Sequence, residues 1–236
     1  TLDDLKALAE SSSWYELLEH AEDVRPSERQ QPWKDLLEKA AVGTVGSLVE
    51  QKKNQEALAA SEGILARFAA LKQSKGFMAK RKDAGLAAFG ECFTDAYSGD
   101  RCIDELDKFA KQDAGDAGLQ FAAGKLVTDK GRFWTAAPPF FARAFEQPAQ
   151  RKTGCKDESV VHSTLRALGQ PADYDTTKAA ATVAFDQCFD DMKDKLLAAF
   201  YASGGYEAQN LCAGLTKKKV SLTPFQTAYC QDQVKK

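Results

Sequence analysis

The chain has 236 residues, of which 44% are hydrophobic and 28% are charged, and its formal net charge is −2. This length is enough to bury a substantial core, in one elongated domain or in two smaller ones. The near-neutral balance argues against a nucleic-acid partner, which usually needs a strongly basic face. No apolar run approaches the ~20 residues of a transmembrane helix, so we predict no transmembrane segment.

The charge is unevenly distributed. Residues 1–50 contain eleven acidic residues and five basic ones, whereas the remainder is mildly basic. The basic clusters at residues 72–82 and 217–219 are short, and we interpret them as solvated helix faces and helix ends.

Apolar residues recur at intervals of three and four, which is typical of helices that bury one face. The longest such stripe runs from Phe185 to Phe200. In chain order, the expected helices are residues 2–10, 14–22, 27–41, 44–51, 55–74, 77–97, 101–111, 115–128, 137–147, 157–168, 175–202, 205–216 and 224–234.

Helix boundaries are marked by local signals. Residues 13–16, 27–30 and 223–226 each fit a capping box, and the glycines at 169 and 204–205 are typical of helix ends. Strand signals are weak, since residues 42–49 and 220–222 are β-branched in part but have no alternating partner run. We therefore predict an all-α fold of stacked antiparallel helical hairpins, solenoid-like or an irregular bundle, cross-linked by disulfides.

The most irregular stretch is residues 128–139, with Gly131 and the Pro138–Pro139 pair. It suggests an N-terminal helical region, 1–130, and a C-terminal helical region, 131–236, with most of the cysteines; one continuous domain is the alternative. The pattern A-F-x-x-C-F-x-D occurs at 88–95 and again at 184–191. The second copy reflects either a duplicated helical unit or chance.

Six well-separated cysteines contain no C-x-x-C pair, so they lack the spacing of zinc ribbons and redox centres. They fit three disulfides, which imply an oxidising compartment; six reduced thiols in a cytosolic protein are the alternative. Six cysteines allow fifteen sets of pairs; short connections between successive helices favour two of the pairs, and the last would then follow by elimination. The expected pairs are Cys92–Cys102, Cys212–Cys230 and Cys155–Cys188.

The sequence begins at Thr1 without a methionine, and it is rich in alanine but has only two asparagines. We expect a targeting segment to have been removed, with a lipid anchor as one form of it. The composition favours a bacterial source. The predicted location is therefore periplasmic, cell-surface or extracellular.

Catalytic signatures are missing from the sequence. His20 lies in a charged helical stretch, and His162 lies near Ser159 and Ser163, but no G-x-S-x-G or H-E-x-x-H motif occurs. No phosphate-binding loop or EF-hand loop is present either. We predict no catalytic residue, no metal site and no cofactor.

Five aromatic residues crowd the region around the proline pair. Such side chains bury a large area at low entropic cost and often anchor a partner. The alternative is that they fill a gap between helical layers. The candidate partner-binding residues are Phe133, Trp134, Phe140, Phe141 and Phe145.

These observations favour a secreted or periplasmic, non-catalytic helical scaffold that binds a protein partner over an enzyme. A helical hydrolase or small-ligand carrier with a Phe-lined cleft is the second hypothesis. A surface-anchored structural protein is the third.

Overall fold

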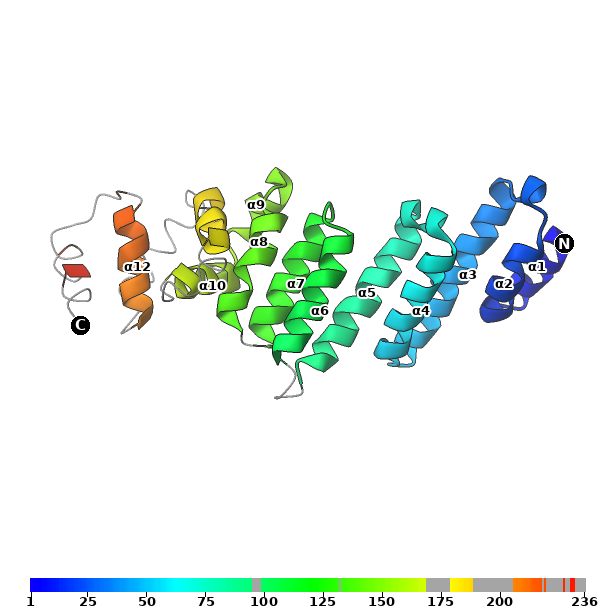
Figure 1. Ribbon diagram of the computed structural model, residues 1–236, viewed down its shortest axis with the longest axis horizontal. Helices are drawn as coiled ribbons and strands as arrows, with labels where there is room; N and C mark the ends of the chain where they lie inside the picture. Colours follow the sequence, from blue (N-terminus) through cyan, green and yellow to red (C-terminus); the bar gives the residue numbers. More distant parts are fainter. Residues whose placement is uncertain are drawn as a thin grey trace. The chain divides into compact units, whose positions relative to one another are not determined.

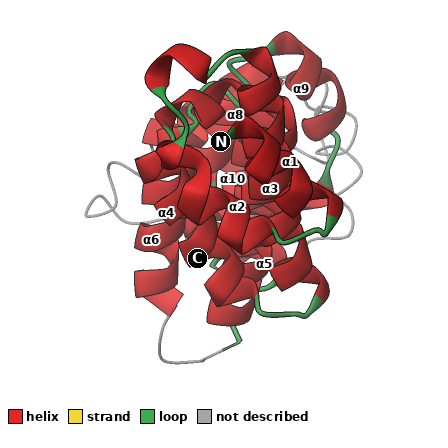
Figure 2. Ribbon diagram, turned by 90° about the vertical axis from the view of Figure 1, so that its right-hand side faces the viewer, coloured by secondary structure: helices red, strands yellow, loops and turns green. Residues whose placement is uncertain are grey.

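The computed structural model describes residues 1–94, 99–131, 133–168, 179–188 and 206–217, together with 219, 227, 230 and 231. Most of these residues are helical and none lies in a strand (Figures 1 and 2). The all-α prediction is therefore confirmed. The chain forms two compact units, Thr1–Glu91 and Cys92–Lys236.

The first unit is a series of neighbouring helices. α3 packs against α1, α2 and α4, and short 3-10 turns complete the connections. The helices are α1 (Leu2–Glu10), α2 (Trp14–His20), α3 (Gln31–Glu50), α4 (Asn54–Arg67) and α5 (Lys75–Cys92); the turns are η1 (Ala21–Asp23), η2 (Pro26–Glu28) and η3 (Ala69–Gln73).

The capping boxes predicted in this unit do not form, and one that was not predicted does. The box forms at Thr1 and Asp4, where Thr1 Oγ1 accepts from the Asp4 amide at 3.3 Å. Ser13 precedes α2 but its side chain makes no capping bond. The segment 27–30 runs from η2 to the residue before α3, so no box forms there. The predicted box at 223–226 lies outside the described residues.

The sequence predicted a break near Gly43, but α3 is one continuous helix of 20 residues. A β-carbon at Gly43 would come within 2.6 Å of Trp14 Nε1. Gly43 therefore makes room for an indole ring from α2 and does not end the helix. Residues 42–49, several of which are β-branched, are also helical, because tertiary packing overrides weak local propensity.

The core of the first unit combines apolar packing with two anchored polar groups. Trp33 Nε1 donates to the Ala21 carbonyl at 2.8 Å, and its ring meets Phe68 edge-on at 6.5 Å. Arg81 is only 1% exposed, and its Nε donates to Glu62 Oε1 at 2.7 Å. Burying a charge is costly unless it is paired, so this ion pair fixes α5 against α4.

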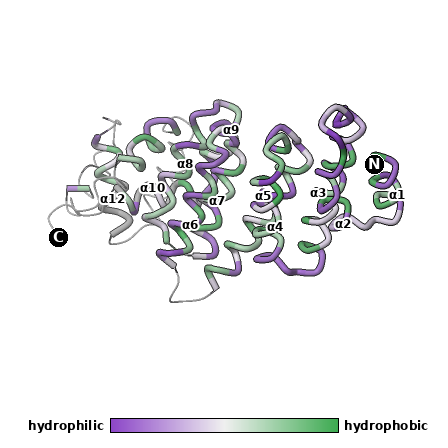
Figure 3. The backbone as a smooth tube through the Cα atoms, turned by 45° about the vertical axis from the view of Figure 1, so that its right-hand side comes forward, coloured by the Kyte–Doolittle hydropathy of each residue, from purple (hydrophilic) through white to green (hydrophobic). Residues whose placement is uncertain are grey.

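The second unit also consists of helices packed in sequence order. α7 contacts α6, α8, α9, α10 and η4, and α10 contacts α12. The elements are α6 (Gly99–Gln112), α7 (Ala117–Asp129), η4 (Trp134–Ala136), α8 (Pro138–Ala144), α9 (Pro148–Gly154), α10 (Glu158–Leu168), helical residues 179–188 and α12 (Tyr206–Lys217). Along the tube in Figure 3, hydrophilic and hydrophobic stretches alternate, as expected of helices that bury one face.

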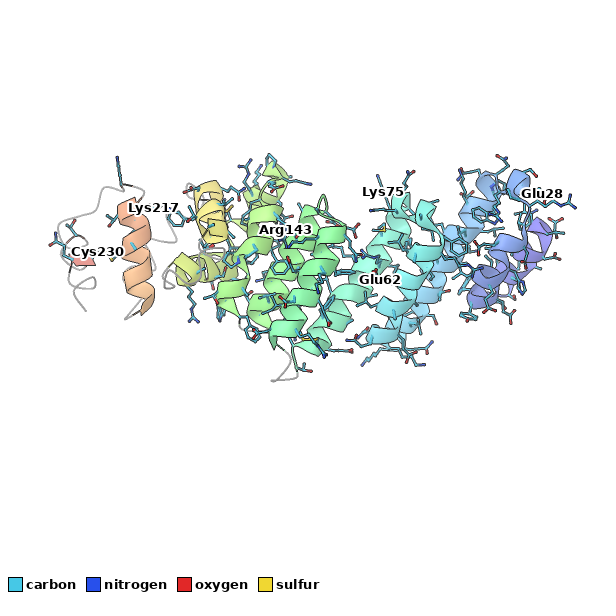
Figure 4. The ribbon with its side chains drawn as sticks, viewed as in Figure 1. Glu28, Glu62, Lys75, Arg143, Lys217 and Cys230 are labelled. Carbon is cyan, nitrogen blue, oxygen red and sulfur yellow. A yellow bond between two sulfur atoms is a disulfide. The ribbon has the colours of Figure 1, made fainter. Side chains whose placement is uncertain are left out.

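The seam expected near residue 130 lies inside this unit, because α7 packs against both η4 and α8 across it. Arg143, labelled in Figure 4, reinforces that contact. Its Nε donates to Gln120 Oε1 and its Nη2 to Asp107 Oδ1, each at 2.7 Å. Three helices, α6, α7 and α8, are thereby joined by one guanidinium. The short helix α9 was not predicted.

All three predicted disulfides are present, and no cysteine is free. Their Cα atoms are 6.0, 5.2 and 5.3 Å apart for Cys92–Cys102, Cys155–Cys188 and Cys212–Cys230. Cys92 pairs with the cysteine that follows it, whereas Cys188 pairs with the one that precedes it. The two copies of the A-F-x-x-C-F-x-D pattern are therefore used differently, which weakens the case for a duplicated unit.

None of the helices in the described part of the chain has the length and apolar character that a bilayer span requires.

The disulfides predict a simple mass result. Alkylation of the protein in denaturant should add no mass, and alkylation after reduction should add six adducts. Each cross-link is worth about 3 kcal/mol in the chain-entropy description, so reduction should also lower the unfolding midpoint. Adducts formed without reductant, measured by intact mass spectrometry, would contradict the pairing.

Candidate functional site

The first unit has an open groove of about 860 Å³ between α2 and α4, with α3 contributing to it. Figure 1 shows α3 between these two helices. The lining residues come from the start of α2, the last half of α3 and one face of α4. They are Ser12, Ser13, Trp14, Tyr15, Glu16, Leu18, Glu19, Thr44, Ser47, Leu48, Glu56, Ala60, Gly63, Ile64, Arg67 and Phe68.

The α2 side of the groove presents two aromatic residues. Trp14 lies against Gly43 of α3, and the ammonium of Lys39 is 5.4 Å from the centre of its ring. Tyr15 is 67% exposed, although large apolar side chains usually bury most of their area. An exposed aromatic beside a groove is typical of interaction surfaces.

The α4 side of the groove is a narrow stripe of residues, with small side chains at its middle. Its lining residues are Glu56, Ala60, Gly63, Ile64 and Arg67, spaced by three and four, so they share one helix face. A β-carbon at Gly63 would meet no heavy atom within 4 Å. Gly63 therefore leaves an unfilled space in this wall.

Arg67 fixes one end of the groove. Its Nε donates to Glu22 Oε2 at 2.6 Å and its Nη2 donates to the Glu19 carbonyl at 3.0 Å. Its guanidinium also lies 4.9 Å from the centre of the Phe68 ring. The last turn of α4 is thereby tied to the end of α2, which holds the two walls at a set separation.

The charges around the groove are mainly negative. Glu16, Glu19 and Glu56 line it, and all three are exposed. The pKa of Tyr15 is raised, chiefly by the hydrogen bond between its hydroxyl and the Glu19 carboxylate. Glu56 is paired with Lys53 at 3.7 Å and Arg67 with Glu22 at 2.6 Å, so the negative charge of the groove comes mainly from Glu16 and Glu19 on the α2 side.

The predicted aromatic cluster lies in the second unit. Phe140, Phe141 and Phe145 are at most 1% exposed, and the ring centres of Phe141 and Phe145 lie 5.7 and 6.1 Å from that of Phe121. This burial supports the alternative that they fill the core. Phe133 and Trp134 are partly buried, and the Arg166 guanidinium lies 5.4 Å from the Trp134 ring centre.

A polar cluster joins α7 to the start of α10. Lys125 Nζ donates to Asp157 Oδ1 at 3.0 Å and to Ser159 Oγ at 2.9 Å, and Ser159 Oγ donates to Asp129 Oδ1 at 2.8 Å. The Asp157 carboxylate also accepts from the Ser159 amide at 2.9 Å, which satisfies a backbone donor at the start of α10.

The titration of this cluster argues for a structural role. Burial lowers the pKa of Lys125, but its hydrogen bonds to Asp157 and Asp129 outweigh that effect and the net pKa is raised. Burial likewise raises the pKa of Asp129, but hydrogen bonds from Ser159, Lys125 and Thr128 lower it overall. A lysine that must activate a serine needs a lowered pKa, so this pair is poorly suited to nucleophilic catalysis.

The histidines do not extend this cluster among the described side chains. His20 Nδ1 lies 2.8 Å from Asp23 Oδ2 on the exposed surface of the first unit. Ser163 Oγ donates to the Val160 carbonyl at 3.1 Å, and the His162 side chain lies outside the described part. No group of three or more acidic, histidine or cysteine side chains suited to a metal occurs among the described residues.

Comparison with known proteins found no matching family model, no matching curated protein and no matching solved structure. Function must therefore be argued from the geometry of the chain itself.

The groove was not predicted from the sequence. One signal for it was present, because the stripe from Glu56 to Arg67 combines small residues with charged ones where a core-facing stripe would be apolar throughout. The aromatics Trp14 and Tyr15 lie in the helix expected at residues 14–22, and the sequence gives them no binding role.

Replacing Asp129 by Asn should change the pH dependence of stability. Because the folded-state pKa of Asp129 is lowered, its contribution is present above the ordinary value of 3.8 and is lost as pH falls through the folded pKa. D129N should be less stable than the parent at pH 7, and this difference should shrink towards pH 2.5. Urea unfolding at both pH values measures it, with exposed Asp104→Asn as control; an equal loss at both pH values would contradict the prediction.

Gly43 of α3 and Gly63 of α4 should respond oppositely to alanine. Gly43→Ala places a methyl group against Trp14 and should destabilise the protein by about 1–3 kcal/mol. Gly63→Ala fills open space in a helix interior and should stabilise it by about 0.5–1 kcal/mol. Chemical denaturation of both variants measures the difference. Equal effects would show that Trp14 does not need Gly43.

Proposed function

We propose that this chain is a secreted or periplasmic helical binding protein that holds a segment of a partner protein in the groove between α2 and α4. The observation that supports it most directly is the open, largely apolar groove with an exposed aromatic, Tyr15, at its edge. Surfaces of this kind are unfavourable in water, so an exposed one is a sign of an interaction site.

The openness of the groove favours a macromolecular partner over a small ligand. Small-molecule pockets bury most of the surface of what they bind. Here Tyr15, Ser47 and Gly63 are all exposed along the groove. A small molecule in it would keep one side in water, whereas a protein segment would cover the groove with its own body.

The residue types in the groove match those that contribute most at interfaces. Tryptophan, tyrosine and arginine dominate binding energy in protein complexes. Trp14, Tyr15 and Arg67 supply all three, and each is held by a contact with its neighbours. Preorganised side chains lose little entropy on binding, which favours affinity.

The three disulfides support a location in the bacterial periplasm, at the cell surface or outside the cell. Disulfides persist where the surroundings are oxidising and are rare in the cytosol. Their restriction to residues 92–230 leaves the unit that contains the groove without a cysteine.

Selection of peptides from a random displayed library on the purified full chain tests this function. Peptides enriched on the parent protein should lose binding to Gly63→Trp, because a β-carbon there has open space around it and the indole ring would occupy the groove. Gly115→Trp in the second unit is the matched control, since a β-carbon there also meets nothing within 4 Å. If no enriched peptide distinguishes the two variants, the groove is not a binding site.

A further inference from the structure

We infer that the segment bound in the groove is a basic amphipathic helix of about three turns. This inference rests on the proposed function and specifies its partner class. It follows from the length of the groove wall, from the backbone chemistry of that wall and from the charge along it.

The length comes from α4. Its lining residues run from Glu56 to Arg67, which is eleven residue steps, or roughly 16 Å at the helical rise of 1.5 Å per residue. A helix of about eleven residues has the same length. Its apolar side chains, spaced by three and four, would follow the similarly spaced stripe of α4.

The walls favour a helix over an extended strand. A bound strand gains affinity by pairing its backbone with the free edge of a sheet. The groove is built from α2, α3 and α4, whose interior backbone groups are already bonded within each helix. A strand would find no free sheet edge to pair with here, whereas a helix satisfies its own amides internally.

Gly63 defines where the closest contact occurs. Because nothing lies within 4 Å of its missing side chain, an apolar anchor of the bound helix fits beside it. Ile64 on the same wall and Leu48 on α3 would contact that anchor, and both are partly exposed. Such a contact removes apolar area from water on both partners.

The charge of the groove selects basic flanks. Glu16 and Glu19 stand on the α2 side, so an occupant meets carboxylates along that edge. On the α4 side, Glu56 is paired with Lys53 at 3.7 Å and Arg67 with Glu22 at 2.6 Å. Lysine or arginine beside the apolar face would be attracted to the α2 edge, and glutamate there would be repelled.

Two synthetic peptides test the inference. Both are capped 14-residue helices with leucine at positions spaced by three and four; one carries lysine at the flanking positions and the other carries glutamate. Fluorescence anisotropy with the full-length oxidised protein measures their affinity at 50 mM and 500 mM NaCl. The lysine peptide should bind, and its affinity should fall with salt because screening weakens exposed charge pairs.

Charge reversal supplies the specific control. The double variant Glu16→Lys/Glu56→Lys should weaken binding of the lysine peptide by about tenfold at low salt. The double variant Glu28→Lys/Asp35→Lys makes the same change in net charge away from the groove and should leave the affinity unchanged. Glu28 is labelled in Figure 4. Circular dichroism of both variants confirms that they fold.

The outcomes separate the two proposals. Equal binding of the lysine and glutamate peptides, abolished by Gly63→Trp, would overturn the charge inference while keeping the groove as the site. Groove-dependent library peptides that contain no basic amphipathic pattern would do the same. Binding of the lysine peptide that survives Gly63→Trp would overturn this inference, because the peptide would then bind elsewhere.

Discussion

The contact between the Trp14 ring and the backbone of α3 at Gly43 sets the arrangement of the first unit. Any side chain larger than hydrogen at Gly43 would meet the indole at 2.6 Å. Trp14 begins α2, so this contact fixes where α2 starts along α3. Because α3 also packs against α4, both walls of the groove are positioned by one continuous helix.

The two units are stabilised by different means. The first contains no cysteine and relies on apolar packing with a few well-placed ion pairs, such as Arg81 with Glu62 and Arg67 with Glu22. The second contains all three disulfides, an aromatic core around Phe121 and a polar cluster at Lys125. A covalent restraint acts mainly by limiting the conformations of the unfolded chain. The groove lies in the unit whose helices are held by packing and ion pairs, without a disulfide.

Much of the fold could be predicted, and the exceptions have physical causes. The three- and four-residue spacing located most helices, and short connections between helices identified two of the three disulfide pairs. The helix break expected at Gly43 was incorrect, because this glycine makes room for the Trp14 ring and does not end α3. The aromatic residues Phe140, Phe141 and Phe145 carried no sign of their burial, since a core stripe and an exposed anchor have the same composition.

The sequence by itself determined the helical class and the acidic bias of the first fifty residues, and it favoured the cysteine pairs that the structure shows. These properties depend on local spacing, on chain connectivity and on composition, all of which can be read from the order of the residues in the chain. Only the tertiary structure decided that Trp14, Gly63 and Arg67 border one groove. Trp14 is far from Gly63 and Arg67 in the chain, and it meets them because α2 and α4 pack on the same helix, which no local pattern specifies.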